Sequence, residues 1–178
     1  KDGYLALNQR KNVAEYEGHI NLHTGGIELH NGMFSPYATC IDEIHEESGI
    51  PREEIPHLEC IALVGNIRIP RPYTLCFHAQ TSLTKGEIEK LQQYRDMKEG
   101  PSKFIPYTYE GLHAFLHQFT SIMLSESLAM IYLLGKEAFG EKWGRKALEI
   151  IDQSHYNFLS LDMKKRKLYE RNLISLVH

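Results

Sequence analysis

The sequence has few of the features that mark secreted, membrane-spanning or nucleic-acid-binding proteins. Its three cysteines, Cys40, Cys60 and Cys76, are an odd number without CxxC spacing, which argues against a disulfide framework and a zinc knuckle. No stretch approaches the ~18 consecutive apolar residues of a transmembrane helix, so no membrane partner is expected. The formal charge of −3 offers no basic excess for a nucleic-acid partner. These absences predict a cytoplasmic protein.

The composition is that of a folded globular protein. Hydrophobic residues make up 42% of the 178 residues and charged residues 24%, which excludes wholesale disorder. A chain of this length suits one domain, or one domain with an appendage, and it can bury a core without disulfides. Because the first residue is Lys and not Met, we expect that a natural N-terminal segment is missing.

The first part of the chain, residues 1–107, predicts a mixed α/β domain. Two helices have clear end signals: one lies between Ser35 and Gly49, and the other opens at a capping box in residues 84–87. Apolar segments, some continuous and some alternating with polar residues, predict strands around these helices. The expected strands cover residues 4–7, 19–23, 58–64, 73–79 and 104–107.

The second part, residues 108–178, predicts an all-helical extension. Its breaks are expected near Gly135, Gly140 and Ser160. Apolar residues are denser here than a peripheral appendage exposes, so we expect the extension to pack on the first domain or on the partner of a homodimer. The segments with helical apolar spacing are 112–119, 128–134, 141–157 and 162–177.

The segment with the most chemical content is an acidic helix over residues 38–50. Glu43, Glu46 and Glu47 stand at i, i+3 and i+4, so one face of the helix carries three carboxylates. Ile44 lies on a different arc that can face the core. Like charges at this spacing destabilise a helix, and a hard divalent cation such as Mg²⁺ would compensate for them. The alternative is a solvated acidic face, which is the usual meaning of an isolated ExxEE pattern.

The same segment resembles the second half of the Nudix signature. That signature has an Arg-Glu pair, an aliphatic residue, any residue, Glu-Glu, any residue, Gly and an aliphatic residue, and residues 43–50 (EIHEESGI) match all but the arginine. Residues 24–28 (TGGIE) are similar to the Gly-Gly turn that starts the signature, and residues 2–10 to an early strand ending in arginine. Two departures stand beside the match. Asp42 replaces the arginine, and the spacing from the Gly-Gly turn is longer, which puts Phe34 where a glutamate is expected.

The resemblance covers residues 2–107 and implies a Nudix-type α/β/α sandwich with a mixed sheet, here followed by the helical C-terminal extension. It implies Mg²⁺-dependent hydrolysis, with Mn²⁺ as a substitute, of the pyrophosphate in a nucleoside diphosphate linked to another group. By this resemblance, Glu46 and Glu47 are metal ligands. Glu43 is a third ligand or orients the attacking water. All three are therefore the expected catalytic residues.

The substrate expectation comes from one branch of the same family. Degenerate signatures occur in the Nudix proteins that hydrolyse UDP-glucose and UDP-galactose, and residues 12–18, 61–68 and 79–84 look like that branch. A UDP-sugar is therefore the leading substrate, followed by ADP-ribose-like molecules. The rival hypothesis is a Nudix-like domain that has lost catalysis and works as a ligand sensor or interaction module, and Asp42 favours it.

Basic residues and histidines supply the remaining candidates. Arg10, Arg68 and Arg71 are expected to bind phosphate or uridine, because a guanidinium pairs bidentately with phosphate, and an ordinary surface role is the alternative for each. His113 and His117 have the i, i+4 spacing of metal ligands. No HExxH arrangement accompanies them, so core or surface histidines are favoured.

Overall fold

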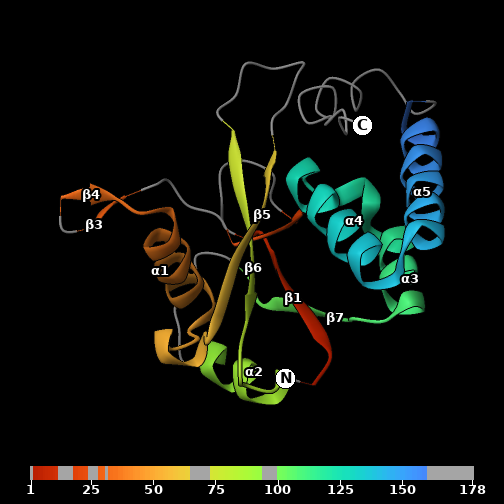
Figure 1. Cartoon of the computed structure of the whole chain (residues 1–178). Helices are drawn as coiled ribbons and strands as arrows, with labels where there is room; N and C mark the ends of the chain where they lie inside the picture. The colour runs from red at the N-terminus through yellow and green to blue at the C-terminus, as the bar shows by residue number, and fades with distance from the viewer. Residues whose placement is uncertain are drawn as a thin grey trace. The chain divides into compact units, whose positions relative to one another are not determined.

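The structure, a computed structural model, describes residues 2–11, 18–23, 28–30, 32–64, 73–93 and 100–159 (Figure 1). Helices and strands both contribute to it, which confirms the mixed α/β class. The chain divides into two compact units. Unit 1 comprises Lys1–Ala62 and Leu75–Phe104, and unit 2 comprises Leu63–Thr74 and Ile105–His178.

The described strands form three small sheets. The first has the order β2-β1-β7, and the hairpins β3–β4 and β5–β6 make one two-stranded sheet each. The Nudix resemblance implied one mixed sheet; among the described residues, β3 pairs with β4 and β5 with β6 in sheets separate from β2-β1-β7. The strands are β1 (Tyr4–Gln9), β2 (Ile20–Asn21), β3 (Leu29–His30), β4 (Met33–Phe34), β5 (His57–Val64), β6 (Thr74–Gln80) and β7 (Ser102–Pro106).

Two strands of the first sheet have one apolar face and one polar face. β1 and β2 are antiparallel, with Asn8 opposite Asn21 and the next pair joining Gln9 to Ile20. Side chains alternate along a strand, and residues directly opposite each other share a face. Leu7 and Ile20 are fully buried on one face, while Asn8 and Asn21 are buried on the other. Buried polar side chains require partners, so the polar face is where a site is expected.

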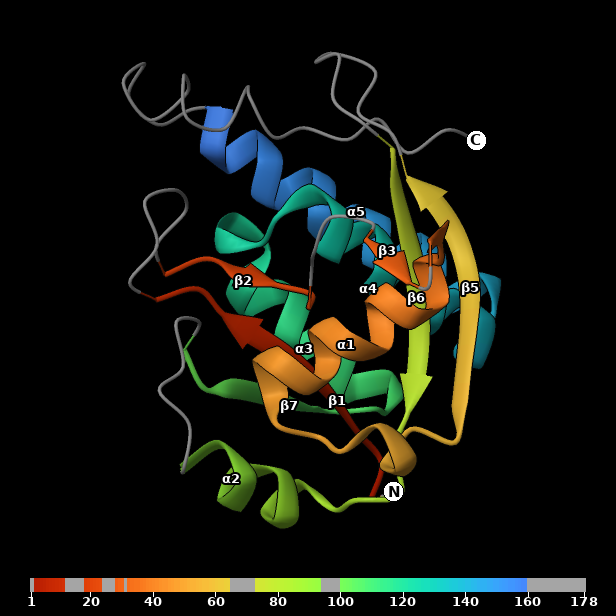
Figure 2. The same ribbon diagram turned by 90° about the vertical axis from the view of Figure 1, so that its left-hand side faces the viewer.

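The helices of unit 1 are α1 (Pro36–Ser48), the short 3-10 helix η1 (Arg52–Glu54) and α2 (Lys85–Gln93), which Figure 2 shows from the side. The predicted ends of α1 are confirmed: the Ser35 side chain accepts from the Ala38 N–H, and Gly49 closes the helix at φ 81°. The capping box of α2 is confirmed as well. Four buried isoleucines then join these three helical segments in one core, namely Ile44, Ile50, Ile55 and Ile88.

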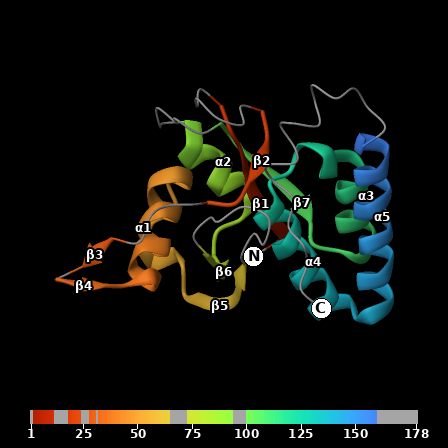
Figure 3. The ribbon, with the colours of Figure 1, turned by 90° about the horizontal axis from the view of Figure 1, so that it is seen from above.

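The described part of unit 2 contains three longer helices and the 3-10 helix η2 (Thr120–Ile122), and α5 packs against both other long helices (Figure 3). Gly140 ends a helix as predicted. The break expected at Gly135 is wrong, because the helix continues through this residue and presents it to the buried Trp143 ring. The predicted segment 162–177 and Ser160 lie outside the described residues. The long helices are α3 (Tyr109–Phe119), α4 (Ser125–Phe139) and α5 (Glu141–Leu159).

The apolar stretch 128–134 lies within α4, and most of its side chains are buried. Among the helices that the structure describes, none combines the length and apolar character needed to cross a membrane.

Candidate functional site

Helix α1 presents the three predicted carboxylates at different depths. Glu46 is exposed and Glu43 is half-buried, whereas the Glu47 side chain is only 11% exposed. The last turn is tied down by Ser48, whose hydroxyl donates to the Ile44 carbonyl and accepts from the Ile50 N–H. Glu47 therefore projects from a firmly closed helix end.

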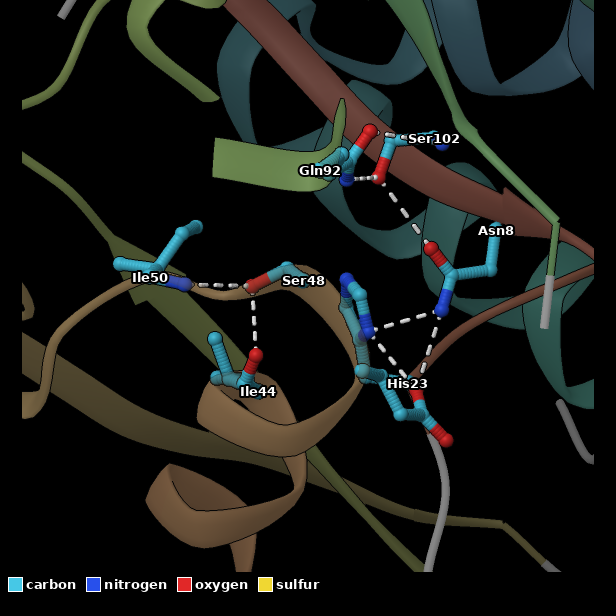
Figure 4. A network of polar contacts seen from close by, with 8 residues as sticks. Asn8, His23, Ile44, Ser48, Ile50, Gln92 and Ser102 are labelled. Carbon is cyan, nitrogen blue, oxygen red and sulfur yellow. Dashed lines mark hydrogen bonds and ion pairs between the residues drawn. The ribbon is translucent and has the colours of Figure 1, made fainter. Parts of the chain in front are cut away.

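Glu47 reaches the polar face of β1 and the segment after β2. Its Oε2 atom lies 2.7 Å from Nδ1 of His23 and 3.1 Å from Nδ2 of Asn8. Figure 4 shows Asn8 and His23 approaching each other beside the end of α1. The Asn8 side chain is fully buried, and the His23 side chain is 15% exposed. The tertiary structure thus joins one predicted residue to two that the sequence did not indicate.

The contacts continue from Asn8 into β7 and α2. Ser102 Oγ lies 3.2 Å from Asn8 Oδ1 and 2.6 Å from Gln92 Nε2. The backbone N–H of Ser102 also donates to Gln92 Oε1 at 3.2 Å. We call Glu47, His23, Asn8, Ser102 and Gln92 the Glu47 network (Figure 4). It connects α1, β1, the segment after β2, β7 and α2, and all five of its residues belong to unit 1.

Sequence reasoning missed four of these five residues for a physical reason. Asn8 is a polar residue at the end of a largely apolar strand, which is a detectable but common pattern. His23 ends an alternating segment, and nothing in the sequence says which helix its ring meets. Ser102 and Gln92 are ordinary polar residues whose partners are distant in the chain, so no local pattern reveals them.

Asp42, the departure from the Nudix signature, forms its own ion pair. Its Oδ1 atom lies 2.7 Å from Nη2 of Arg52 in η1, and its Oδ2 atom lies 3.6 Å from Nδ1 of His30 in β3. Arg52 thus supplies a cation from outside the helix, and this ion pair joins α1 to η1.

Glu43 lies beside a thiol on the same helix. Burial, together with the nearby Glu43 carboxylate and the Cys60 side chain, raises the pKa of Cys40 to about 11. Cys40 is therefore a protonated thiol near neutral pH and a poor nucleophile.

The carboxylates of α1 are the candidate metal ligands. In the described parts of the chain, no group of three or more His, Cys, Asp or Glu side chains is arranged to hold a metal ion. Mg²⁺ commonly takes one or two protein carboxylates and completes its shell with water and substrate phosphates. The oxygen donors on α1 thus have suitable chemistry for an ion shared with a phosphate substrate, but they do not form a complete cage.

The predicted arginines have different outcomes. Arg10 continues the β1–β2 ladder, since its N–H donates to the His19 carbonyl at 2.8 Å. Its Nε atom is buried and has no hydrogen-bond partner among the described residues. Arg68 and Arg71 lie outside the described residues, as does the Gly-Gly turn at 25–26.

His113 belongs to the core of unit 2, as favoured from the sequence. The side chain is 5% exposed, and its ring stacks on Trp143 with centroids 4.9 Å apart. His113 Nε2 also lies 3.3 Å from the Trp143 carbonyl oxygen, to which it can donate. This ring is committed to packing and is not a metal ligand in this arrangement.

Comparison with known proteins adds no assignment. No protein-family model matches the chain, and no curated protein matches it significantly.

Proposed function

We propose that the protein is a Nudix-type hydrolase that cleaves the pyrophosphate of a nucleoside diphosphate linked to another group. A UDP-sugar is the leading substrate, and ADP-ribose-like molecules come next. The observation that carries the proposal is the Glu47 carboxylate, held by His23 and Asn8 at the polar face of β1. A solvated acidic face would leave all three glutamates in water, whereas this one enters a buried polar network.

Each acidic residue has a proposed part in this reaction. Glu43, Glu46 and Glu47 are the carboxylates that would hold Mg²⁺ or Mn²⁺ together with the substrate phosphates. The ion, when bound, would neutralise the charge that develops on the diphosphate. Glu43, half-buried one turn before Glu47, would either be the third ligand or orient the attacking water.

Arg10 is the proposed phosphate-binding residue among those described. It stands two positions after Asn8, so a continuing strand places both side chains on one face, about 7 Å apart. A buried guanidinium nitrogen without a partner is costly, and a phosphate oxygen would satisfy it. Arg68 and Arg71 remain proposed substrate-binding residues from the sequence.

The second candidate function is a Nudix-like domain that binds a ligand without turnover. Two observations favour it: the signature position is occupied by the Asp42–Arg52 pair, and the described residues form no complete metal cage. Both candidates predict ligand binding, and only the first predicts hydrolysis.

The test is hydrolysis of a UDP-sugar panel with Mg²⁺, using Glu46→Gln, Glu47→Gln and, as the control, Glu89→Gln on the exposed face of α2. We expect each α1 variant to lower turnover at least about 100-fold, because several kcal/mol of transition-state stabilisation are lost. The metal-induced rise in Tm should shrink as well, since that rise reports binding to the folded state. Full activity in both α1 variants would refute the assignment, and binding without turnover in the parent would select the second candidate.

The arginines are tested in the same assay. Arg10→Ala, Arg68→Ala and Arg71→Ala should each raise KM about tenfold or more, because a charge-assisted contact contributes about 1.5–3 kcal/mol. Lys90→Ala on α2 is the matched control for the loss of one cation. An unchanged KM in all three variants would show that these arginines do not bind the substrate.

The remaining proposals concern location and assembly. We propose a cytoplasmic protein, because Cys40, Cys60 and Cys76 are all free thiols, a state that a reducing compartment maintains. We also propose that the protein forms a homodimer. Its proposed ligands are nucleoside-diphosphate small molecules, and neither nucleic acid nor membrane is a proposed partner.

A further inference from the structure

We infer that Asn8, Ser102 and Gln92 are positioning residues, which orient the Glu47 carboxylate through a chain of hydrogen bonds that runs in one direction. The inference rests on the proposed function for its catalytic meaning, since it assigns these residues to the glutamate that the hydrolysis would use. It assigns a role to three residues outside the acidic helix, one each from β1, β7 and α2.

The direction begins at the backbone of Ser102. A backbone N–H can only donate, so the Gln92 atom that faces it at 3.2 Å is the acceptor Oε1. The Gln92 amide nitrogen must then face the Ser102 hydroxyl, 2.6 Å away, and donate to it. The hydroxyl has one hydrogen, which remains for Asn8 Oδ1 at 3.2 Å.

The same reasoning assigns donors and acceptors at the other end of this chain of hydrogen bonds, where it reaches Glu47. Because Asn8 Oδ1 accepts from Ser102, its amide nitrogen Nδ2 faces Glu47 and donates to Oε2 at 3.1 Å. An ionised carboxylate only accepts, so His23 Nδ1, 2.7 Å from the same oxygen, is the second donor. The 2.9 Å approach of Asn8 Nδ2 to His23 Nδ1 is then a contact between two donors that converge on Oε2.

Burying two amide side chains costs free energy, so stability alone does not explain this arrangement. Asn8 is fully buried and Gln92 is 8% exposed, whereas apolar side chains of similar volume would avoid the desolvation of two amides. A satisfied polar network, by contrast, rigidifies one arrangement of its members. Here the arrangement determines which Glu47 oxygen is occupied by donors, and it spans residues 94 positions apart in the chain.

The experiment combines Ser102→Ala with Glu47→Gln in a double-mutant cycle, measured with a UDP-sugar and Mg²⁺. Partners that orient a functional ligand typically contribute about 10–100-fold to activity, so Ser102→Ala should lower kcat about tenfold or more and leave KM nearly unchanged. Ser102→Thr keeps the hydroxyl and should recover most of kcat. In the Glu47→Gln background, Ser102→Ala should cause no further loss.

A control in unit 2 separates positioning from folding. Thr120→Val removes another buried hydroxyl, which donates to the Leu116 carbonyl in unit 2, and should change Tm without changing kcat. Losses of kcat that multiply independently in the Ser102→Ala/Glu47→Gln pair would overturn the inference. So would a loss in Ser102→Ala that Ser102→Thr does not recover.

A readout independent of turnover distinguishes this inference from the proposed function. The side-chain amide of Asn8 donates to Glu47, so its NMR signals should shift in both Ser102→Ala and Glu47→Gln and stay unchanged in Thr120→Val. If these shifts occur and the parent hydrolyses no substrate in the panel, the positioning chain is supported while the proposed function fails. If the Asn8 side-chain amide signals stay unchanged in either variant, the proposed chain of hydrogen bonds is overturned, whatever the activity.

Discussion

At the scale of single residues, Trp143 shows how one side chain organises unit 2. It is fully buried, and its Nε1–H donates to the Tyr109 carbonyl at 3.2 Å. The His113 ring stacks on one face, and Gly135 of α4 leaves room for the ring where any Cβ would overlap it. Glycine in the middle of a helix normally destabilises it, so its presence at 135 is explained by this close approach.

Gly135→Ala therefore tests the packing directly. The indole is fixed by a hydrogen bond and a stacked ring, so the added methyl group must strain the helix pair, with an expected cost of about 1–3 kcal/mol. The matched control is Gly86→Ala in α2, where a Cβ meets nothing within 4 Å and the change should gain about 0.5–1 kcal/mol. Urea unfolding measures both, and an unchanged or higher midpoint for Gly135→Ala would contradict the close approach.

His113 predicts a pH dependence of stability. Burial lowers the pKa of His113 from its ordinary value of 6.5, outweighing the opposing hydrogen bond to Trp143. As pH falls through 6.5 towards the lower folded-state pKa, the unfolded chain takes up the proton first, so this contribution to stability is full above 6.5 and is lost on acidification. Lys146 and His117 act in the same direction, and Glu110 opposes them.

The measurement is the slope of unfolding free energy against pH below neutrality, in the parent and in His113→Phe. We expect a shallower slope in the variant, because Phe takes up no proton. The absolute stabilities differ for packing reasons, so the slopes are compared. Equal slopes would show that His113 does not contribute.

At the scale of elements, helix α1 is stabilised by contacts at its two ends more than by the residues in its middle. Three acidic residues at i, i+3 and i+4 repel one another, yet Ser35 caps the start and Gly49 closes the end with its N–H donating to the His45 carbonyl at 3.0 Å. Thr39 adds a tie, since its hydroxyl accepts from the Glu28 N–H at 3.0 Å. These contacts hold the helix that carries the candidate site.

Ser35→Ala should expose the contribution of the cap. Losing a side-chain cap costs about 1 kcal/mol, which corresponds to a Tm lower by roughly 2–4 °C for a chain of this size. Ser35→Asp keeps an acceptor at the same position and should retain the parent Tm. Differential scanning calorimetry distinguishes the two variants. Equal Tm values for Ser35→Ala and the parent would show that the cap does not stabilise α1.

At the scale of the whole molecule, many apolar side chains of the three described long helices are buried. Leu112, Leu116 and Ile131 are fully buried, and the long helices of unit 2 contact one another. These buried side chains are not available to the surface through which a dimer was expected. Among the described residues, the large apolar side chains that are exposed include Met33 and Phe34 of β4.

The homodimer remains a prediction that light scattering can decide. At micromolar concentration we expect a mass twice the 20.6 kDa of the chain, falling towards one chain mass on dilution if the dimer is weak. A single-chain mass throughout the range would reject the dimer.

The sequence by itself determined the local features of this protein. The caps of α1, the capping box of α2 and the helix end at Gly140 are encoded within a few residues, because they depend on hydrogen bonds between near neighbours. The strands β1, β2, β5, β6 and β7 follow from apolar patterning in the same way, whereas β3 and β4 were not predicted. Gly135 is the instructive exception, because the sequence predicted a break and only the distant Trp143 gives this glycine its role.

The tertiary structure decided what the acidic helix faces. The sequence placed Glu43, Glu46 and Glu47 on one helix face, but their unequal burial depends on the strands that lie against α1. Glu47 meets His23 and Asn8 across 24 and 39 positions of chain, and Ser102 meets Asn8 across 94. Helical and strand periodicity acts over a few residues, so only the packing of separate elements could bring these side chains together.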